Sequence, residues 1–363
     1  MKSPTSKLIK SLLASAFMAI PASTSTVAAD VINDFNGNGR SDLAVYHAAS
    51  GEWFVRTRTG AVLEWRRQWG YADAIAVPAD YNGDGRTDLA VYGRNGGLWY
   101  IITREGQVLA WARQWGWNTA VPVPGDYDGD GKADLGVYDL ETGDWYVYSI
   151  AKQQVLMWRN SWGFKGDFRW WERPPASTVI PVPFDFDQDG IVDQTVYYRG
   201  YTMNDSAWYV RGSKGKNWFG VKNSNGEGWG SSSSIPAPGF YRNHIQNALN
   251  PFAPGVTTYK IPTGEFNTPF MHNFVLGAYR RTLPVPAHDF DGNGWHDHAV
   301  YDYLSGVWTI SYNDEDGNGA PPNGAVYQQP PREAIPWGFN GAVPANIYST
   351  IYNACGYTLA PLW

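Results

Sequence analysis

The sequence Asp126-Tyr-Asp-Gly-Asp-Gly-Lys-Ala-Asp134 runs directly into Leu135-Gly-Val-Tyr138. Oxygen-bearing side chains stand at positions 1, 3, 5 and 9 of this segment, and glycines at positions 4 and 6 allow the backbone to turn tightly. Carboxylate oxygens are the ligands that calcium prefers in protein loops. The segment therefore predicts a calcium-binding loop that leads into a β-strand.

The same spacing occurs in five copies along the chain. The candidate calcium ligands are Asp34, Asn36, Asn38 and Asp42; Asp80, Asn82, Asp84 and Asp88; Asp126, Asp128, Asp130 and Asp134; Asp185, Asp187, Asp189 and Asp193; and Asp289, Asp291, Asn293 and Asp297. Solvated acidic turns would explain one copy, but they do not explain five with matching offsets. We therefore expect up to five structural calcium ions.

These loops differ from the EF-hand, which requires Glu at position 12 and a helix on each side. Position 12 is Val in every copy, inside a Val-Tyr pair that is typical of a strand. Position 7 tolerates any side chain, which indicates that only its backbone carbonyl faces the ion. Its occupants are Arg40, Arg86, Lys132, Ile191 and Trp295. A strand-loop-strand unit is therefore expected around each cation.

The loops belong to a longer repeat. Their opening Asp residues at 34, 80 and 126 are 46 residues apart. Each of these units contains the Val-Tyr strand, a strand with a central Trp, a third strand of the form Val-Leu-x-Trp, and then Trp-Gly and Val-Pro. Four short strands in a period of 40 to 50 residues predict one blade of a β-propeller. The expected fold class is all-β.

Later units keep these features with changes. An insertion at residues 165–177 precedes the fourth loop, the fifth unit has Phe240 where Asp should open a loop, and the sixth unit restores the loop. A seventh start, Ala342-Val-Pro-Ala-Asn346, is followed by possible strands at 350–352 and 356–359. We expect seven blades, with residues 25–32 supplying the missing strand of the last. Six blades with a C-terminal tail are the alternative.

The two ends of the chain have different compositions. Residues 1–29 have three lysines, a short apolar run and then small residues, as in a secretory signal peptide. A membrane anchor is less consistent, because the run is too short to span a bilayer. We expect residues 30–363 to form a single secreted, periplasmic or cell-surface domain. Cys355 is the only cysteine, so no intrachain disulfide is possible, and no basic stripe suggests nucleic acid.

The loops and their period resemble the FG-GAP/VCBS repeat family, which includes the propellers of integrin α-subunits. The resemblance covers residues 34–363, weakly in units five and seven. It implies calcium loops between the first two strands of a blade in extracellular proteins that bind proteins or glycans. The family also contains lectins, adhesins and polysaccharide-degrading enzymes, so the fold alone does not define a function.

Candidate ligand contacts lie where the repeat is broken. Tryptophans at the same offset in each unit, such as Trp69 and Trp115, are expected to pack between blades. The insertion and the fifth unit are free of that role, and their candidate ligand-binding residues are Trp170, Trp171, Tyr241, Arg242 and His244. We favour a binding module whose partner is a glycan or an extracellular protein. A polysaccharide lyase with Tyr241 or His244 as base, and a purely structural protein, are the alternatives.

Overall fold

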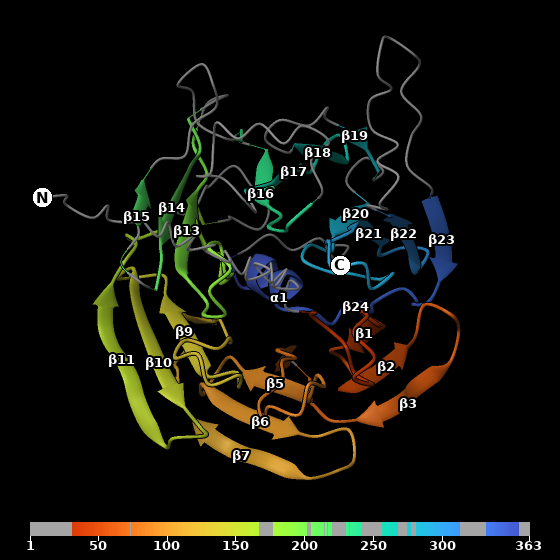
Figure 1. Cartoon of the computed structure of the whole chain (residues 1–363), viewed down its shortest axis with the longest axis horizontal. Helices are drawn as coiled ribbons and strands as arrows, with labels where there is room; N and C mark the ends of the chain where they lie inside the picture. Colours follow the sequence, from red (N-terminus) through yellow and green to blue (C-terminus); the bar gives the residue numbers. More distant parts are fainter. Residues whose placement is uncertain are drawn as a thin grey trace, which may run out of the picture.

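The computed structural model describes residues 31–72, 74–166, 177–201, 205–213, 215, 217–219, 230–231, 233–241, 256–267, 274–276, 281–312 and 332–355. Its described strands form six four-stranded sheets. These sheets are arranged as blades around a central axis (Figure 1). The all-β propeller is therefore confirmed with six blades, and the expectation of seven is wrong.

Blades 1 to 3 contain the long outer strands. Blade 1 has the order β24 (Val343–Pro344), β1 (Leu43–His47), β2 (Glu52–Arg56) and β3 (Val62–Gln68). Blade 2 contains β4 (Ala74–Ala76), β5 (Leu89–Gly93), β6 (Leu98–Ile102) and β7 (Val108–Gln114). Blade 3 contains β8 (Ala120–Pro122), β9 (Leu135–Asp139), β10 (Asp144–Ser149) and β11 (Gln154–Ser161).

Blades 4 to 6 have the same antiparallel order. Blade 4 contains β12 (Val179–Pro181), β13 (Gln194–Tyr198), β14 (Ala207–Arg211) and β15 (Asn217–Phe219). Blade 5 contains β16 (Ser234–Pro236), β17 (Thr258–Lys260), β18 (Glu265–Asn267) and β19 (Phe274–Val275). Blade 6 contains β20 (Thr282–Pro284), β21 (His298–Asp302), β22 (Val307–Ser311) and β23 (Arg332–Pro336).

The repeated Trp of the third strand fills the core of its blade. Trp53, Trp99, Trp145, Trp208 and Trp308 are completely buried. In blade 2, the indole N–H of Trp99 donates to the carbonyl of Trp115 at 2.6 Å, and its ring meets Tyr92 edge-on at 5.2 Å. A buried indole needs such a partner for its N–H. The Val-Tyr and Trp strands of the repeat are therefore the two central strands of a blade.

Glycine is required in the turn between the two central strands of a blade, where the Trp-Gly segment of the same blade passes close to it. Gly97 has φ of +63°, and a Cβ built on it would lie 2.1 Å from the carbonyl carbon of Gly116. Both the left-handed backbone and the close approach exclude larger residues. The same contact joins Gly51 to Gly70, and it recurs in blades 3 and 6. This explains why a Gly and a Trp-Gly pair recur in the repeat.

Residues 342–346, which match the start of a repeat in sequence, close the ring. In β24, Val343 and Pro344 pair with Tyr46 and Val45 of β1, and the N–H of Ala345 donates to the carbonyl of Ala44 at 2.9 Å. The last repeat start thus supplies the innermost strand of blade 1. Because this pairing removes the free sheet edge, no seventh blade is needed.

The chain then forms a helix at the centre of the ring (Figure 1). Helix α1 (Ile347–Ala354) begins after Asn346, whose side chain accepts a hydrogen bond from the N–H of Ser349 at 2.8 Å. Asn346 thus caps a helix at the position where Asp80 opens a loop. The strand expected at 350–352 is therefore wrong, and residues 25–30 and 356–359 lie outside the described part. No described helix has the length and hydrophobicity needed to span a membrane.

Helix α1 holds several blades together from inside. The hydroxyl of Tyr348 donates to the carbonyl of Pro183 in blade 4 at 2.9 Å. Thr350 and Tyr352 donate to the carbonyls of Ala76 and Pro236, in blades 2 and 5. The helix therefore contacts the inner strands of blades on different sides of the axis.

Candidate functional site

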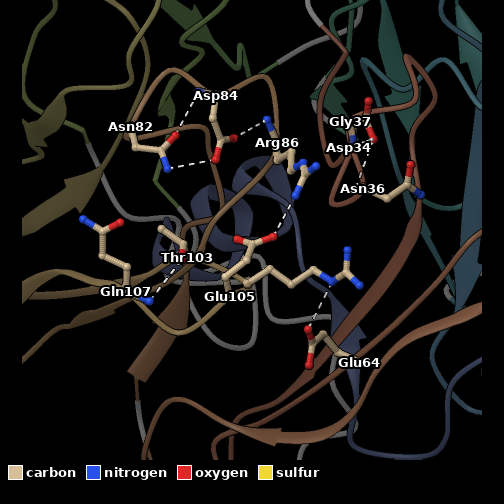
Figure 2. Close-up of polar contacts among 11 residues, drawn as sticks. Asp34, Asn36, Gly37, Glu64, Asn82, Asp84, Arg86, Thr103, Glu105 and Gln107 are labelled. Atoms are coloured by element: carbon tan, nitrogen blue, oxygen red, sulfur yellow. Dashed lines mark hydrogen bonds and ion pairs between the residues drawn. The ribbon is translucent and has the colours of Figure 1, made fainter.

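In blades 2, 3, 4 and 6 the acidic loop joins the inner strand of the blade to the second strand, and in blade 1 it leads into β1, whose inner neighbour β24 comes from the C-terminal part of the chain. In blade 2 the loop leaves β4 and returns at β5, with a bridge between Ala79 and Asp88 at its base. Figure 2 shows Asn82, Asp84 and Arg86 of this loop beside Asp34 and Asn36 of the loop in blade 1. The predicted position between the first two strands is confirmed.

The Asp at position 1 folds the loop around itself. In blade 3, the carboxylate of Asp126 accepts hydrogen bonds from the N–H groups of Gly129 and Gly131, both at 2.7 Å. These glycines have φ of +76°, which turns their N–H groups toward the carboxylate. In blade 4, Gln188 occupies position 4 instead of glycine and adopts the same left-handed conformation, with φ of +57°.

The Asp at position 9 closes the loop from the other side. Asp134 accepts a hydrogen bond through Oδ2 from the N–H of Tyr127 at 3.1 Å. The equivalent bond in the other loops measures 2.8–3.0 Å. Positions 1 and 9 are therefore fixed by the backbone, and they face each other across the loop.

Three loops bring three carboxylates together. These triads are Asp126, Asp128 and Asp134; Asp185, Asp187 and Asp193; and Asp289, Asp291 and Asp297. Within each triad, one oxygen of every residue lies within 4.8 Å of the others. Such an arrangement suits a divalent cation, because like charges at this distance repel unless an ion neutralises them.

Burial makes this repulsion more costly. It raises the pKa of Asp88 and of Asp193 to about 7, and the neighbouring loop carboxylates add to both shifts. It also raises the pKa of Asp134 and Asp185 to about 6. A bound cation would favour the ionised carboxylates that burial disfavours.

One buried oxygen in blade 3 supports this fit directly. Asp128 Oδ1 is inaccessible to solvent and accepts no hydrogen bond within the described part of the chain. The other oxygen of Asp128 lies 2.8 Å from Nζ of Lys152. A buried carboxylate oxygen without a donor is costly, and a calcium ion in the loop would satisfy it.

The loops of blades 1 and 2 contain amides in place of carboxylates. In blade 1, Nδ2 of Asn36 lies 3.3 Å from both oxygens of Asp42. In blade 2, Asn82 donates to Asp84 at 3.0 Å (Figure 2). These loops therefore satisfy part of their negative charge internally. Because fewer carboxylates favour weaker calcium binding, the loop of blade 1, with two Asp, is expected to be the weakest site, and the loops of blades 3 and 4, with four Asp each, the tightest.

Neighbouring loops are joined around the ring. The N–H at position 8 donates to the carbonyl at position 1 of the loop before it: Thr87 to Asp34, and Ala133 to Asp80, both at 2.7 Å. The contact continues in blade 6, where His296 donates to Phe240 at 3.0 Å. Phe240 therefore occupies the position of the lost loop Asp in blade 5.

The side chain at position 7 also contacts the preceding loop. A Cβ built on Gly37 would lie 3.1 Å from Cγ of Arg86, whose guanidinium pairs with Glu105 at 2.7 Å (Figure 2). Lys132 lies against Gly83 in the same way. Position 7 is therefore variable because its side chain packs outside its own loop.

Four of the five predicted ligand-binding residues lie outside the described part of the chain, namely Trp170, Trp171, Arg242 and His244. Tyr241 is described and is buried, with its ring stacked on His298 at 3.9 Å between centroids. Burial raises the pKa of its hydroxyl far above the ordinary value for tyrosine. Tyr241 thus lies in the interior of the protein rather than on a surface open to a ligand.

A set of surface residues was missed by the sequence reasoning. Trp69, Trp115 and Trp162 lie half-buried between blades, as expected, and each donates its indole N–H to a carbonyl of the next blade. Trp65, Trp111 and Trp158, in contrast, are mostly exposed on the outer strands of blades 1 to 3. A sequence signal existed, because blade 6 lacks a Trp at this position.

The fold and loops define a β-propeller with acidic loops between its first two strands. A scan against protein-family models matches FG-GAP-like repeats at residues 34–91 and 80–137. The chain is therefore a β-propeller that contains FG-GAP-like repeats. A search of curated protein sequences gave no match.

Solved structures with a related shape are distant. A lectin of Agrocybe aegerita that recognises non-reducing terminal N-acetylglucosamine has 15% identity and a TM-score of 0.42, with 85% of this chain and 79% of the lectin covered. The dihydro-heme d1 dehydrogenase NirN has 10% identity and a TM-score of 0.38, with 87% and 77% covered. The V. cholerae biofilm matrix protein Bap1 has 13% identity and a TM-score of 0.28, with 76% and 51% covered. Similarity at this level does not bear on the ligand of this chain.

Proposed function

We propose that the protein is an exported, calcium-stabilised β-propeller that acts as a carbohydrate-binding module. The observation that carries the calcium part is the set of three carboxylate triads, each within 4.8 Å and each on a loop shaped by backbone hydrogen bonds. Export is supported by the signal-like residues 1–29. It also agrees with calcium use, since extracellular calcium modules work at high ion concentrations.

Carbohydrate is the ligand class that the exposed aromatic side chains support. Trp65, Trp111 and Trp158 present most of their indole surface to solvent. A flat ring with an apolar face and a polar edge can stack on the C–H face of a sugar ring while the sugar hydroxyls remain hydrated. Aromatic residues are also those that most often dominate binding energy.

The lyase alternative gains no support from the described residues. Its candidate base Tyr241 is buried, so that a substrate cannot reach it. Its raised pKa also keeps the hydroxyl protonated, so that it cannot accept a proton from a substrate. Its other candidates, Arg242 and His244, are outside the described part. We therefore propose no reaction.

A glycan array probed with the calcium-loaded protein tests the proposed function. We expect saturable binding to a defined set of glycans, without release of unsaturated products from uronate polymers. Absence of binding to every glycan, with the protein shown to be folded by circular dichroism, would contradict the proposal. Release of such products would establish the lyase instead.

A further inference from the structure

Three indoles on the outside of the propeller are unusually exposed. Trp65 of β3, Trp111 of β7 and Trp158 of β11 are 64%, 69% and 65% exposed. They occupy equivalent positions on the outermost strands of three consecutive blades. Scattered exposed apolar residues need no explanation. A mostly exposed tryptophan that recurs at one position in three blades does need an explanation.

Each of these tryptophans precedes a residue with a left-handed backbone. The residues are Arg66, Ala112 and Arg159, with φ of +57°, +53° and +54°. The pairing between the two outer strands shifts register at the same place in all three blades. Each tryptophan thus lies next to a β-bulge, a device that re-aims a side chain. A left-handed backbone is unfavourable for residues other than glycine, and such strain is typically kept at functional sites.

The propeller does not require this bulge. In blade 6, Thr309 pairs with Ala334, as Phe54 pairs with Trp65 in blade 1. The register of blade 6 is continuous from Val307 to Ser311, and Ala334 replaces the tryptophan. The bulge and the exposed indole therefore occur together in blades 1 to 3, and both are missing in blade 6. Fold stability alone does not explain them.

Other aromatic rings hold each indole in place. Trp111 contacts Tyr100 of its own blade edge-on at 5.3 Å, and Trp69 of the preceding blade at 5.8 Å. Trp65 contacts Phe54 at 5.3 Å and Trp337 at 5.8 Å. Trp158 has the same two contacts, with Tyr146 at 5.3 Å and Trp115 at 6.1 Å. Such fixed rings lose little conformational entropy on binding.

Charged groups flank two of the three indoles. In blade 1, Nε of Arg66 lies 2.8 Å from Oε1 of Glu52. Glu52 lies on the same face of β2 as Phe54, because side chains alternate along a strand. The ion pair and the indole of Trp65, which contacts Phe54, therefore share one face of the blade.

Blade 3 repeats this arrangement and blade 2 does not. Nε of Arg159 lies 3.6 Å from Asp144, which also accepts a hydrogen bond from Ser161 at 2.6 Å. In blade 2, Leu98 and Ala112 occupy the positions of the acid and the arginine. The second indole therefore lacks this ion pair, whereas the first and third have its donors and acceptors beside them.

We infer that Trp65, Trp111 and Trp158 form three separate sugar-stacking sites, each for one equatorially substituted hexopyranose. This inference rests on the proposed carbohydrate-binding function. Glucose-type pyranoses expose a flat C–H face, and their equatorial hydroxyls reach sideways toward groups such as Arg66 and Glu52. Three exposed indoles, one on each of three successive blades, suit repeated sugar units. The sites in blades 1 and 3 bind more tightly than the site in blade 2, because only they add hydrogen bonds.

The test combines glycan-array binding with titrations of cellotetraose and chitotetraose into the protein. Tryptophan fluorescence measures binding in the titrations. Trp65→Ala and Trp158→Ala are expected to weaken binding by about tenfold each at their own sites, the order expected for one lost aromatic contact. Trp111→Ala has a smaller effect, and the triple variant loses both binding and the fluorescence shift. The control is Leu304→Ala, which removes an exposed apolar side chain from blade 6 and leaves binding unchanged.

The outcomes separate the site from the function. If the wild-type protein binds glycans and the folded triple variant binds them equally well, the site assignment is wrong and the proposed function stands. If the wild-type protein binds none, both are wrong. A triple variant that changes only the oligomeric state would identify the indoles as a protein interface and overturn the inference.

Discussion

At the residue scale, the role of a loop carboxylate depends on whether backbone N–H groups already donate hydrogen bonds to its oxygens. Asp126 has both oxygens occupied by glycine N–H groups, whereas Asp128 Oδ1 is buried without a donor. Both residues were predicted as calcium ligands from their spacing alone. Spacing does not show that the first also shapes the loop and that the second has a buried oxygen without a donor.

A pair of substitutions compares a carboxylate-rich loop with an amide-rich loop. We expect Asp128→Asn to lower the melting temperature in calcium more than Asn36→Ala, because it removes a charged ligand from a triad. In chelator, Asp128→Asn should instead lower the melting temperature less than Asn36→Ala, since it then relieves repulsion between buried carboxylates. Differential scanning calorimetry of both variants with and without calcium measures the effect. If Asp128→Asn lowered the melting temperature equally with and without calcium, Asp128 would not act through a cation.

The tryptophans show where residue-level reasoning from sequence stops. Trp65 and Trp69 are four positions apart and both recur in units one to three, so their sequence patterns look alike. The first is exposed and the second is half-buried between blades. The difference comes from a bulge at Arg66, and a bulge has no reliable signature when the left-handed residue is not glycine. Only the missing tryptophan in blade 6 indicated that the first set is dispensable for folding.

At the element scale, the strands were predictable and the closure was not. The Val-Tyr and Trp strands follow from their β-branched and aromatic residues and from the Gly turns between them. The segment 342–346 matched a repeat start, and it does form an inner strand, but in blade 1 rather than in a new blade. The same sequence pattern fits both outcomes, because pairing with the other end of the chain is a tertiary contact.

Helix α1 was missed for a similar reason. Residues 350–352 are β-branched and aromatic, which favours a strand by composition. Inside the ring they lie in a helix whose hydroxyls bond to carbonyls of three blades. Tertiary packing has overridden local propensity here.

Cys355 provides a direct reporter of the docked helix. It follows α1, is completely buried, and accepts a hydrogen bond through its carbonyl from the N–H of Ser177 at 2.8 Å. Burial raises the pKa of its thiol to about 12. Because the thiolate is the reactive form, we expect almost no labelling by iodoacetamide at pH 8 in the native protein. Since it is the only cysteine, mass spectrometry reads the result unambiguously.

Denaturant provides the control for this experiment, because unfolding must expose the thiol and allow complete labelling. Rapid labelling of the native protein at the rate of a free cysteine would show that α1 does not stay in the centre of the ring. Labelling that accelerates only after chelation of calcium would connect the loops to the stability of the helix.

At the scale of the whole molecule, the loops form a nearly continuous chain around the ring. Position 8 of one loop donates to position 1 of the loop before it at five places in the described structure. Each of these loops is therefore built partly on its neighbour, and a calcium ion that ordered one loop would also fix an acceptor for the next. We expect calcium to stabilise the propeller as a unit rather than blade by blade.

Thermal unfolding with and without calcium measures whether calcium stabilises this fold. An ion at a hundred times its dissociation constant adds about 2.7 kcal/mol per site to the stability of the folded state. The melting temperature should therefore fall by more than about 10 °C in excess chelator and recover when calcium is restored. Elemental analysis must confirm that the ions have been removed. An identical melting temperature for protein shown to be free of calcium would mean that calcium does not stabilise the propeller.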